Sequence, residues 1–516
     1  MNPLWNEDTL GALIRRQAAA RPDAPALLAG DARISWSEYA GRVARLAAGL
    51  RSIGVAPGDT VAVQLPNLPE FLVAYGAIVS LRAVMQTVHM PYRRAELAFL
   101  LRHSAASTFI GLSAFKGEAP AAQVVQLRGA LAQLKNVIAL GGPVDGAHGF
   151  AELAASAPLA QFPQARPDDP FLLLYTSGTT DNPKGTLHAH RGFLANARLS
   201  VPELEVTALD VLLSVAPLTH LYGLFVYHLS VHSGAAMSLL AAFTPPDLAQ
   251  LIEAHRATAV FAGPAHFKPM LDAGLADGHD FASLRFVCLS GTAVAPQLAE
   301  AVERKLPNGK AIQLWGMSEL QAGSYTRPRD AEIVRWSSAG AASPGTELRV
   351  VGDEGRLQAR GASVFAGYLN NEPATREAFT WDGWFETGDT AKLMPGGELV
   401  LTGRVKEIIN RGGVKYSPID IEAIIDRMPG VARSAVVPMA DHVLGERACV
   451  FVQAASGAPG VPPVKVTLQE IRKCLEREGV AKFKWPERLE LLDALPLTPT
   501  QKVMRGRLRE LLEEGT

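Results

Sequence analysis

The feature that most constrains the fold of this chain is an alternation of short apolar runs with longer segments of helical spacing. The run DTVAVQLPN (59–67) is typical of a strand leading into a loop, and EFLVAYGAIVSLRAV (70–84) then carries apolar residues at helical intervals. Similar runs follow as FLLLYTSG, VLLSVAPL, AAMSLLAAF, TAVFAGPA, RFVCLSG and AIQLWGMSE. Repetition of strand then helix predicts parallel, doubly wound sheets.

Several of these runs end in small or polar residues. The ends read TSG, APLTH, AGPA, LSGTA and WGMSE. Ligands of doubly wound sheets bind beyond the carboxyl ends of the strands. We therefore expect a binding site at these ends.

Composition excludes several kinds of partner. The chain has 516 residues, enough for several domains, with 48% hydrophobic and 20% charged residues, as in ordinary globular proteins. Its net charge of −1 gives no indication of a nucleic acid or an acidic membrane as partner. Cys288 and Cys449 lie in apolar runs, and with Cys474 they form no CxxC pair. We expect reduced core cysteines in a cytoplasmic protein.

One uncharged stretch raises the question of a membrane span. Residues 211–246 contain no Asp, Glu, Lys or Arg, and a spanning helix needs about 20 mostly apolar residues. Pro217, Gly223 and Gly234 interrupt this stretch, so we interpret it as strand, loop, helix and strand in a core and expect no membrane span. The segment 1–22 places acids before arginines, which favours an amphipathic helix over a secretory signal.

The stretch YTSGTTDNPKG (175–185) has the chemistry of a phosphate-binding loop but is not a Walker loop. The Walker pattern requires a second glycine and a Ser or Thr where this chain has Pro183 and Gly185. Hydroxyls, two glycines and Lys184 can nevertheless hold phosphate oxygens in another geometry. Taken alone, an ordinary loop between a strand and a helix explains the stretch as well.

Five separated stretches together resemble the adenylate-forming superfamily of acyl-CoA synthetases, stand-alone adenylation domains and luciferases. In chain order they are YTSGTTDNPKG (175–185), LWGMSEL (314–320), GWFETGD (383–389), GRVKEIINRGGVKYSPIDIE (403–422) and LPLTPTQKVMR (495–505). Each stretch alone is a modest match, but all five in the family's order are specific. The resemblance covers essentially the whole chain.

The resemblance implies an α/β fold with a large N-terminal domain of doubly wound sheets and helices plus a β-barrel-like subdomain, followed by a small, mobile α+β C-terminal domain. The expected limits are 1–403 for the N-terminal domain, 404–406 for a hinge and 407–516 for the C-terminal domain. The change of pattern towards short strands after residue 340 agrees with this division. Lys406 occupies the family's hinge position, where the C-terminal domain pivots between two poses.

The family's reaction has two steps. A carboxylate attacks the α-phosphate of ATP and expels pyrophosphate, and the acyl-adenylate then acylates a thiol, usually that of coenzyme A. Two anions meet in the first step, so positioning and charge neutralisation supply most of the catalysis. The resemblance thus implies ATP, Mg²⁺ and coenzyme A, with a small-molecule carboxylic acid as the other substrate.

The resemblance assigns the nucleotide site to several stretches. The 175–185 stretch covers the β- and γ-phosphates, Trp315 stacks on adenine opposite GTA (291–293), and Asp389 and Arg404 contact the ribose. The expected ATP-binding residues are Thr176, Ser177, Gly178, Thr179, Thr180, Lys184, Gly291, Thr292, Ala293, Trp315, Gly316, Met317, Asp389 and Arg404. Asp181 departs from the family's usual glycine and places a carboxylate beside the triphosphate.

Catalysis is expected from Lys502, Glu319 and Ser318. By resemblance, Lys502 bridges the substrate carboxylate and the α-phosphate, Ser318 donates to the α-phosphate, and Glu319 binds the magnesium ion. Oxygen ligands of this kind suit a hard cation. Ser318 replaces a usual Thr, and Gln501 replaces a common Gly.

The remaining expected residues belong to the two acceptor groups. The acyl pocket is expected to involve His220, Tyr222, Gly223, Phe225 and Gly263, and the thioester step Gly412, Gly413 and Lys415. HAH (188–190) has the residue types of a metal site, but histidines two apart at a helix start do not face each other. We expect no metal there.

These assignments predict an ATP- and Mg²⁺-dependent acid–CoA ligase acting on a small or medium-chain, alicyclic or aryl acid. An acyl-AMP ligase that loads a carrier-protein thiol is the nearest alternative, and a luciferase-like oxygenase is a more distant one. An inactive nucleotide-binding paralogue is the alternative from another class, and only Asp181 favours it. The expected assembly is a monomer or a homodimer.

Overall fold

The computed structural model of the chain describes residue 5 and residues 7–176, 183–411, 414–442, 444–455, 466–498 and 502–514. The described chain divides into two compact units. The first contains the residues up to Thr176, Pro183–Leu348 and Ala359–Phe385, and the second contains Arg349–Gln358 and the chain from Glu386 onward. The predicted hinge at 404–406 lies inside the second unit, and the predicted domain limits stay a prediction.

Two sheets form the frame of the first unit. The seven-stranded sheet has the order β7-β6-β5-β3-β4-β8-β9, and only β8 and β9 pair antiparallel. Its strands are β3 (Thr60–Gln64), β4 (Val84–Thr87), β5 (Thr108–Leu112), β6 (Asn136–Leu140), β7 (His148–Gly149), β8 (Pro170–Tyr175) and β9 (Gly185–Ala189).

The nine-stranded sheet has the order β16-β15-β14-β13-β12-β10-β11-β1-β2. Its inner strands are parallel, and the hairpins β1–β2 and β14–β15 add antiparallel pairs. Its strands are β1 (Pro25–Ala29), β2 (Ala32–Ser35), β10 (Val211–Ser214), β11 (Ala236–Leu239), β12 (Ala259–Ala262), β13 (Phe286–Leu289), β14 (Lys310–Met317), β15 (Gln321–Tyr325) and β16 (Ala341–Ala342).

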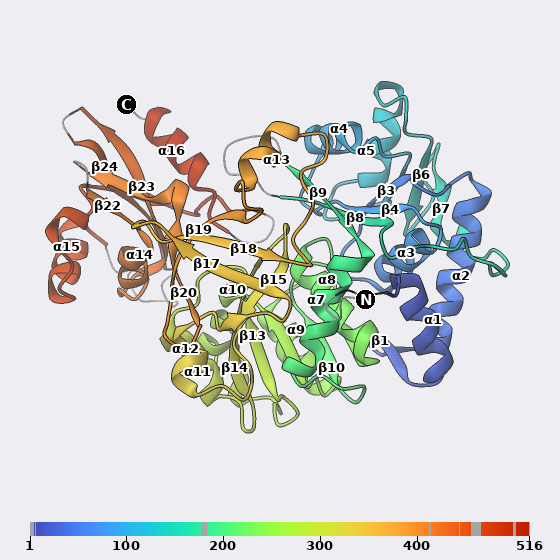
Figure 1. Ribbon diagram of the computed structural model, residues 1–516, viewed down its shortest axis with the longest axis horizontal. Coiled ribbons are helices and arrows are strands. Elements are labelled where there is room, and N and C mark those ends of the chain that lie inside the picture. The colour runs from blue at the N-terminus through green and yellow to red at the C-terminus, as the bar shows by residue number, and fades with distance from the viewer. Residues whose placement is uncertain are drawn as a thin grey trace. The chain divides into compact units, whose positions relative to one another are not determined.

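Helices cover both faces of each sheet, as the doubly wound pattern predicts. The helices of the shared core between the sheets are α1 (Leu10–Ala20), α2 (Trp36–Ser52), α3 (Pro69–Ser80), α6 (Phe150–Ala154), α7 (His190–Glu203) and α8 (Leu221–Ser233). The outer helices are α4 (Arg94–His103) and α5 (Pro120–Leu127) on one sheet, and α9 (Pro245–Ala254), α10 (Pro264–Asp272), α11 (Pro296–Arg304) and α12 (Glu332–Ser337) on the other. Figure 1 shows α4 and α5 on one side of β3 and β4, and α3 on the other.

The strand sequences explain this layering. Neighbouring residues of a strand point to opposite faces, so Ile110 enters the core between the sheets while Phe109 packs under the outer helices. Helix α3 lies between the sheets because Phe71–Ser80 is apolar or small on every side and fully buried. The uncharged stretch 211–246 contains β10, α8 and β11, which confirms the predicted strand, loop, helix and strand.

One predicted helix ends earlier than its apolar spacing indicates. The sequence predicts a helix over 70–84, whereas α3 ends at Ser80 and Val84 already belongs to β4. Arg82 adopts a left-handed φ of 60°, and its guanidinium pairs with Asp169 at 2.9 Å. This turn breaks the helix and directs the chain back into the sheet. In the described part of the chain, no helix combines the length and apolarity needed to cross a membrane.

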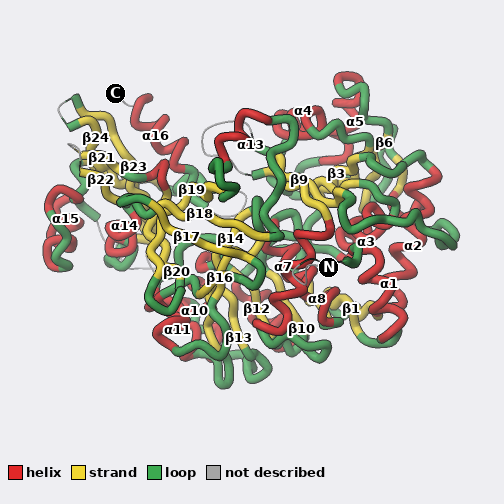
Figure 2. The backbone as a smooth tube through the Cα atoms, viewed as in Figure 1, coloured by secondary structure: helices red, strands yellow, loops and turns green. Residues whose placement is uncertain are grey.

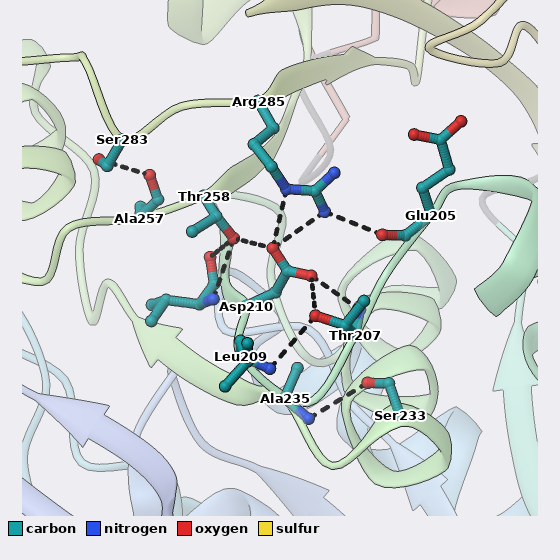
Figure 3. Close-up of polar contacts among 11 residues, drawn as sticks. Glu205, Thr207, Leu209, Asp210, Ser233, Ala235, Ala257, Thr258, Ser283 and Arg285 are labelled. Carbon is teal, nitrogen blue, oxygen red and sulfur yellow. Dashed lines mark hydrogen bonds and ion pairs between the residues drawn. The ribbon is translucent and has the colours of Figure 1, made fainter.

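A polar cluster joins the amino ends of three parallel strands. Asp210, just before β10, accepts from the Thr258 hydroxyl at 2.6 Å and from the Arg285 guanidinium at 2.9 and 3.0 Å (Figure 3). Thr258 and Arg285 directly precede β12 and β13. Thr207 completes the shell of Asp210 with a backbone N–H at 2.7 Å. The cluster thus fixes the amino ends of these strands, whereas ligands are expected at their carboxyl ends.

After residue 345 the next strands form a four-stranded sheet in the order β17 (Thr346–Val351), β18 (Arg356–Gly361), β19 (Phe385–Leu393), β20 (Leu399–Arg404), in line with the predicted change of pattern. The strands from β21 onward, in the second unit, combine with helices into an α+β body. Figure 2 shows the strands of the four-stranded sheet and the group that includes β21 to β24 in yellow. The remaining elements are α13 (Glu372–Ala378) of the first unit, and β21 (Ile409–Arg411), β22 (Val414–Tyr416), β23 (Val431–Asp441), β24 (Gly445–Ala454), β25 (Arg488–Leu492), α14 (Ile419–Ile425), α15 (Leu468–Arg477) and α16 (Arg505–Glu514) of the second.

Helices cover both faces of the β23–β24 hairpin. Val436 and Val450 face the core shared with α14 and α15, while Val437 and Phe451 face α16. Cys449 lies in this second core and Cys288 in the first unit's core, where both are free thiols, as predicted.

Candidate functional site

The predicted phosphate loop starts at the carboxyl end of β8 and returns to β9. The backbone N–H and the hydroxyl of Thr176 both donate to the carbonyl oxygen of Lys184, at 3.0 and 3.4 Å, and so join the two ends of the loop. The predicted residues Ser177, Gly178, Thr179 and Thr180, and also Asp181, lie outside the described residues. The structure therefore places two members of the predicted loop, Thr176 and Lys184.

The predicted catalytic pair Ser318 and Glu319 lies in the tight hairpin between β14 and β15. Gln321, which pairs with Met317 across the hairpin, has a left-handed φ of 68° that is unusual for a residue other than glycine. A Cβ at Gly316 would lie 2.1 Å from the Gln321 carbonyl oxygen, so only glycine fits there. Such backbone strain clusters at functional sites. Here it sets the path of the turn that carries Ser318 and Glu319.

His188 holds the backbone of this hairpin from the strand that follows the phosphate loop. Its Nε2 lies 2.8 Å from the carbonyl oxygen of Ser318, and because a carbonyl only accepts, Nε2 carries the proton. The imidazole packs against Phe193 with ring centroids 4.2 Å apart. Burial lowers the pKa of His188 to about 4. A neutral histidine thus links β9 to the Ser318 backbone.

Glu319 is held by two residues of the segment 365–368. The Tyr368 hydroxyl donates to Glu319 Oε1 at 3.0 Å, and the backbone N–H of Phe365 donates to the Glu319 carbonyl oxygen at 2.7 Å. The Nζ of Lys184 lies 4.9 Å from the centroid of the Tyr368 ring, a cation–π distance. Burial, together with the Glu319 carboxylate, raises the pKa of Tyr368, so its hydroxyl stays protonated. Tyr368 therefore joins Lys184 to Glu319.

The residues predicted to face adenine lie at the ends of neighbouring parallel strands. Gly291, Thr292 and Ala293 follow β13 and are exposed, whereas Trp315 lies on β14 and is only 6% exposed. The Trp315 indole packs on Gly323 of β15, where a Cβ would lie 2.2 Å from the ring atom Cζ3. Gly323 thus makes the space that the Trp315 ring occupies.

Three of the predicted acyl-pocket residues lie in the segments that follow parallel strands or against such strands, His220 after β10, Gly263 after β12 and Tyr222 against β13. His220 caps α8 by accepting from the Tyr222 backbone N–H at 3.2 Å. The Tyr222 hydroxyl donates to the carbonyl oxygen of Cys288 at 2.8 Å, and Gly263 directly follows β12. Phe225 is different, because it is 1% exposed in the core between the sheets.

A histidine that sequence reasoning missed lies beside His220. The rings of His89 and His220 stack with centroids 6.3 Å apart, and His89 Nδ1 lies 2.9 Å from the Thr219 hydroxyl. The first turn of α8 packs closely on the preceding loop, since a Cβ at Gly223 would lie 2.4 Å from the Pro217 carbonyl oxygen. His89, from a distant part of the sequence, therefore packs against the predicted pocket segment.

In the second unit, the two predicted ribose-binding residues are direct neighbours. Asp389 on β19 and Arg404 on β20 lie opposite each other, and Arg404 Nε donates to Asp389 Oδ1 at 2.7 Å. The Thr387 hydroxyl accepts from the Asp389 backbone N–H at 3.1 Å. The Asp389 side chain is 10% exposed and that of Arg404 is 45% exposed. The arginine therefore orients a carboxylate that remains partly accessible.

In the second unit, Lys502 lies three residues before Arg505, the centre of a buried ion-pair network. The backbone N–H of Lys502 donates to the Thr498 hydroxyl at 3.1 Å, and the Thr498 N–H donates to the Lys502 carbonyl oxygen at 2.7 Å. Three residues later, Arg505 pairs with Glu422 at 2.6 Å and with Glu407 at 3.2 Å. Glu407 directly follows Lys406, which is exposed. The predicted catalytic loop and the predicted hinge are thus tied to one arginine.

The residues predicted for the thioester step occupy the stretch of sequence from β21 to β22. Gly412 and Gly413 lie outside the described residues, as does the side chain of Lys415. The backbone of Lys415 pairs with Asn410 between β22 and β21.

Two family descriptions match the chain. AMP-binding enzyme matches residues 14–369, and AMP-binding enzyme C-terminal domain matches residues 420–502. The first match alone covers more than half of the sequence. The chain belongs to the AMP-binding enzyme family. This confirms the predicted resemblance.

Individual relatives of this AMP-binding enzyme extend the match over nearly its full length. A medium-chain fatty-acid–CoA ligase of Escherichia coli (strain K12) is 29% identical over 98% of this chain and 91% of its own length. A 2,3-dihydroxybenzoate-AMP ligase of Bacillus subtilis (strain 168) is 30% identical over 99% of this chain and 95% of its own. The crystal structure of the anthranilate CoA ligase AuaEII with anthranoyl-AMP superposes with a TM-score of 0.88 at 23% identity, covering 100% and 99% of the two chains, which confirms the fold.

The residues of this AMP-binding enzyme suit a hard cation that is bound partly by the nucleotide phosphates better than a cation bound by protein ligands alone. Among the described residues, no group of three or more His, Cys, Asp or Glu could hold a metal ion. Glu319 offers a buried carboxylate of which Oε1 is oriented by Tyr368. Magnesium bound through one or two carboxylates completes its shell with phosphates and water. The histidines of HAH do not contribute, since His188 binds the Ser318 carbonyl and His190 Nδ1 accepts from the Leu10 N–H at 3.3 Å.

Besides His89, sequence reasoning missed the positioning roles of His188, Tyr368 and Arg505 in the predicted site of the AMP-binding enzyme. The contacts of His188 and Tyr368 reach across 130 and 49 residues to the Ser318–Glu319 pair. Arg505 stands at the end of the matched stretch LPLTPTQKVMR and could have been noticed as a cation close to Lys502. For His188 the only signal was the pair of histidines already considered as metal ligands.

Proposed function

We propose that the chain is an AMP-forming carboxylic acid–CoA ligase. The observation that carries the proposal is the link from Lys184 through Tyr368 to Glu319, which connects the phosphate-loop lysine with the predicted metal ligand in a member of the AMP-binding enzyme family. A carboxylate oxygen of the substrate forms a bond to the α-phosphorus of ATP, and the bond to pyrophosphate breaks. The thiol sulfur of coenzyme A then bonds to the acyl carbon, and AMP leaves.

In the first step, this chain supplies positioning and positive charge. Lys184 and the loop that Thr176 closes bind the β- and γ-phosphates, and the Ser318 hydroxyl donates to the α-phosphate. Mg²⁺, when bound at Glu319, would neutralise phosphate charge. Preorganised donors of this kind are worth about 10²–10³ in rate each. Trp315 and residues 291–293 hold the adenine.

The second unit supplies the remaining groups. Asp389, oriented by Arg404, accepts from the ribose hydroxyls. Lys502 places its ammonium between the substrate carboxylate and the α-phosphate. For the thioester step, a C-terminal domain starting at 407 pivots at 404–406, around Lys406, and brings Gly412, Gly413 and Lys415 to the thiol. Such a pivot lets one site perform two half-reactions.

The acid is a small or medium-chain, alicyclic or aryl acid. The names of the relatives support this range, because one acts on a medium-chain fatty acid and another on 2,3-dihydroxybenzoate. His220, Tyr222, Gly223 and Gly263 are the proposed determinants of the acid, without Phe225, which lies in the core between the sheets. We place the reaction in the cytoplasm, where ATP and coenzyme A are available, and the assembly as a monomer or homodimer.

Loading of a carrier-protein thiol is the second candidate function. It is favoured by the 30% identity to an enzyme named as an AMP ligase rather than a CoA ligase. The two functions share the first step and differ only in the thiol that accepts the acyl group.

Pyrophosphate release tests the proposal directly. It would be measured with ATP and Mg²⁺ over short, medium, cyclohexane and benzoate-type acids, with and without coenzyme A. Steady turnover that requires coenzyme A supports the CoA ligase and identifies the acid. Release that stops near one equivalent in both conditions supports the carrier-protein function, and no release with any acid contradicts both.

A further inference from the structure

We propose that Tyr368 is a positioning residue of the adenylation site and that its ring and its hydroxyl have separate tasks. The ring lies under the ammonium group of Lys184, and the hydroxyl orients the carboxylate of Glu319. The inference rests on the proposed function, because it assigns Lys184 to the phosphates of ATP and Glu319 to its metal ion.

The hydroxyl contact answers a specific requirement of Glu319. This residue is only 6% exposed, and a buried carboxylate is costly unless hydrogen bonds satisfy it. The Tyr368 hydroxyl provides such a bond to Oε1 at 3.0 Å. Partners that orient a metal-binding carboxylate restrict its rotation and tune its affinity, and their removal typically costs about 10–100-fold in metal affinity or activity.

The ring contact acts on the other side of the tyrosine. Lys184 Nζ lies 4.9 Å from the ring centroid, close enough for the ring to attract and orient the ammonium group. This attraction does not depend on the hydroxyl, since phenylalanine offers the same kind of ring face. A single side chain therefore sets the direction of both a cation and an anion.

The backbone around Tyr368 fixes its side chain in this place. Residue 368 forms a β-bridge with Thr186 of β9, and the N–H of Leu369 donates to the Gly185 carbonyl oxygen at 2.8 Å. On the other side, the Thr375 hydroxyl accepts from the Tyr368 N–H at 2.9 Å. The tyrosine is thus anchored to the strand that leaves the phosphate loop, which is the arrangement a positioning residue needs.

The separation of tasks predicts different effects of two substitutions. Tyr368→Phe removes the hydroxyl and keeps the ring, so the concentration of Mg²⁺ that half-saturates ATP binding should rise about 10-fold. ATP affinity without Mg²⁺ should stay at the wild-type value. Tyr368→Leu removes both groups and should weaken ATP binding also without Mg²⁺, because Lys184 loses its support.

Titration calorimetry of the full chain with ATP, with and without Mg²⁺, tests this inference, and melting temperatures monitor folding. Tyr39→Phe is the matched control, since it removes a buried tyrosine hydroxyl that is bonded to Tyr227 at 2.6 Å and to the Leu72 carbonyl oxygen at 2.9 Å rather than to Glu319. It should leave both ATP affinities unchanged. A wild-type Mg²⁺ requirement in Tyr368→Phe, or equal losses with and without Mg²⁺, would overturn the proposal.

The same titration separates this inference from the proposed function. If wild type binds ATP with Mg²⁺ but turns over no acid, the ligase assignment fails and the positioning role is still decided by the variants. If wild type binds no ATP in either condition, both are overturned.

Discussion

Arg505 and Glu422 form a two-point ion pair in the second unit, with Nη1 at 2.6 Å from Oε1 and Nη2 at 2.7 Å from Oε2. Both side chains are largely buried, at 14% and 11% exposure, and Arg505 also contacts Glu407 at 3.2 Å. Burial lowers the pKa of the Arg505 guanidinium, but the surrounding carboxylates, chiefly Glu422, outweigh burial and leave the pKa raised. The network joins Arg505, three residues after Lys502, to Glu407, which follows Lys406. Its loss should therefore disturb the segments around both lysines.

Arg505→Met should destabilise the second unit strongly. Removal of one partner from a buried ion pair leaves the other charge uncompensated and costs about 3–5 kcal/mol. Chemical denaturation followed by circular dichroism measures the effect. Arg507→Met is the control, because the ion pairs of Arg507 with Glu510 and Glu514 lie on an exposed face, so its loss should leave the free energy of unfolding nearly unchanged. Equal stabilities of the two variants would contradict the prediction.

Asp389→Asn should raise the KM for ATP about 10-fold or more and leave the KM for the acid nearly unchanged. The Asp389 carboxylate is held by Arg404 and is proposed to accept from the ribose hydroxyls, and hydrogen bonds to a charged group contribute about 1.5–3 kcal/mol. Steady-state kinetics with varied ATP and varied acid measure both constants. Glu347→Gln, which disturbs an exposed pair with Arg360, should leave both at wild-type values.

His188→Leu should lower the rate of adenylation about 10-fold, because the Ser318 carbonyl loses its donor and the hairpin loses a defined position. His188→Gln, whose amide N–H can also donate, should recover most of the rate. Burst measurements of pyrophosphate release give the rate of this step, and melting temperatures control for general destabilisation. If Gln and Leu variants are equally slow, the hydrogen bond to Ser318 is not the cause.

Lys502→Ala should nearly abolish adenylation, while thioester formation from pre-made acyl-adenylate survives. Lys406→Pro should have the opposite effect, because it restricts the proposed pivot and leaves the adenylating groups intact. The two half-reactions would be followed separately, as pyrophosphate release and as consumption of free thiol. Equal slowing of both steps by Lys502→Ala would refute the assignment of two poses.

The first unit should lose stability as the pH falls below about 6.5. Burial lowers the pKa to about 4 for His89, His188 and His266, and to about 3 for His190 and His232. The unfolded chain binds protons at these histidines below about pH 6.5, whereas the folded chain does not. Each pH unit below this value therefore lowers the free energy of unfolding by about 1.4 kcal/mol per histidine, until the pH nears the lowered pKa values. Calorimetric melting at pH 7.5 and 5.0 measures the loss. An unchanged melting temperature would contradict the prediction.

The sequence predicted the strands and the positions of the motifs, because both depend on local pattern. Apolar runs such as RFVCLSG form buried strands wherever they lie, and the small or polar residues after them mark the binding edge. The contacts that orient the site could not be read in this way. Tyr368 meets Glu319 only because two segments 49 residues apart are brought together by the fold.

The limits of local pattern are equally clear in α3. Its apolar spacing continues to Val84, yet the chain turns at Arg82, whose backbone is left-handed and whose guanidinium pairs with Asp169. Asp169 lies 87 residues further along the chain, so no local rule includes it. Similarly, the resemblance assigned Phe225 to the acyl pocket, whereas its side chain faces the core between the sheets.

The polar cluster around Asp210 has a consequence for how such an enzyme can change its substrate. Asp210, Thr258 and Arg285 secure the starts of β10, β12 and β13, whereas His220, Gly263 and residues 291–293 follow the far ends of the same strands. Loops at the far ends can therefore be exchanged with those of relatives while the anchored ends keep the strands in register. Substrate range can thus change, in evolution or in the laboratory, while the strands that form the framework of the fold stay the same.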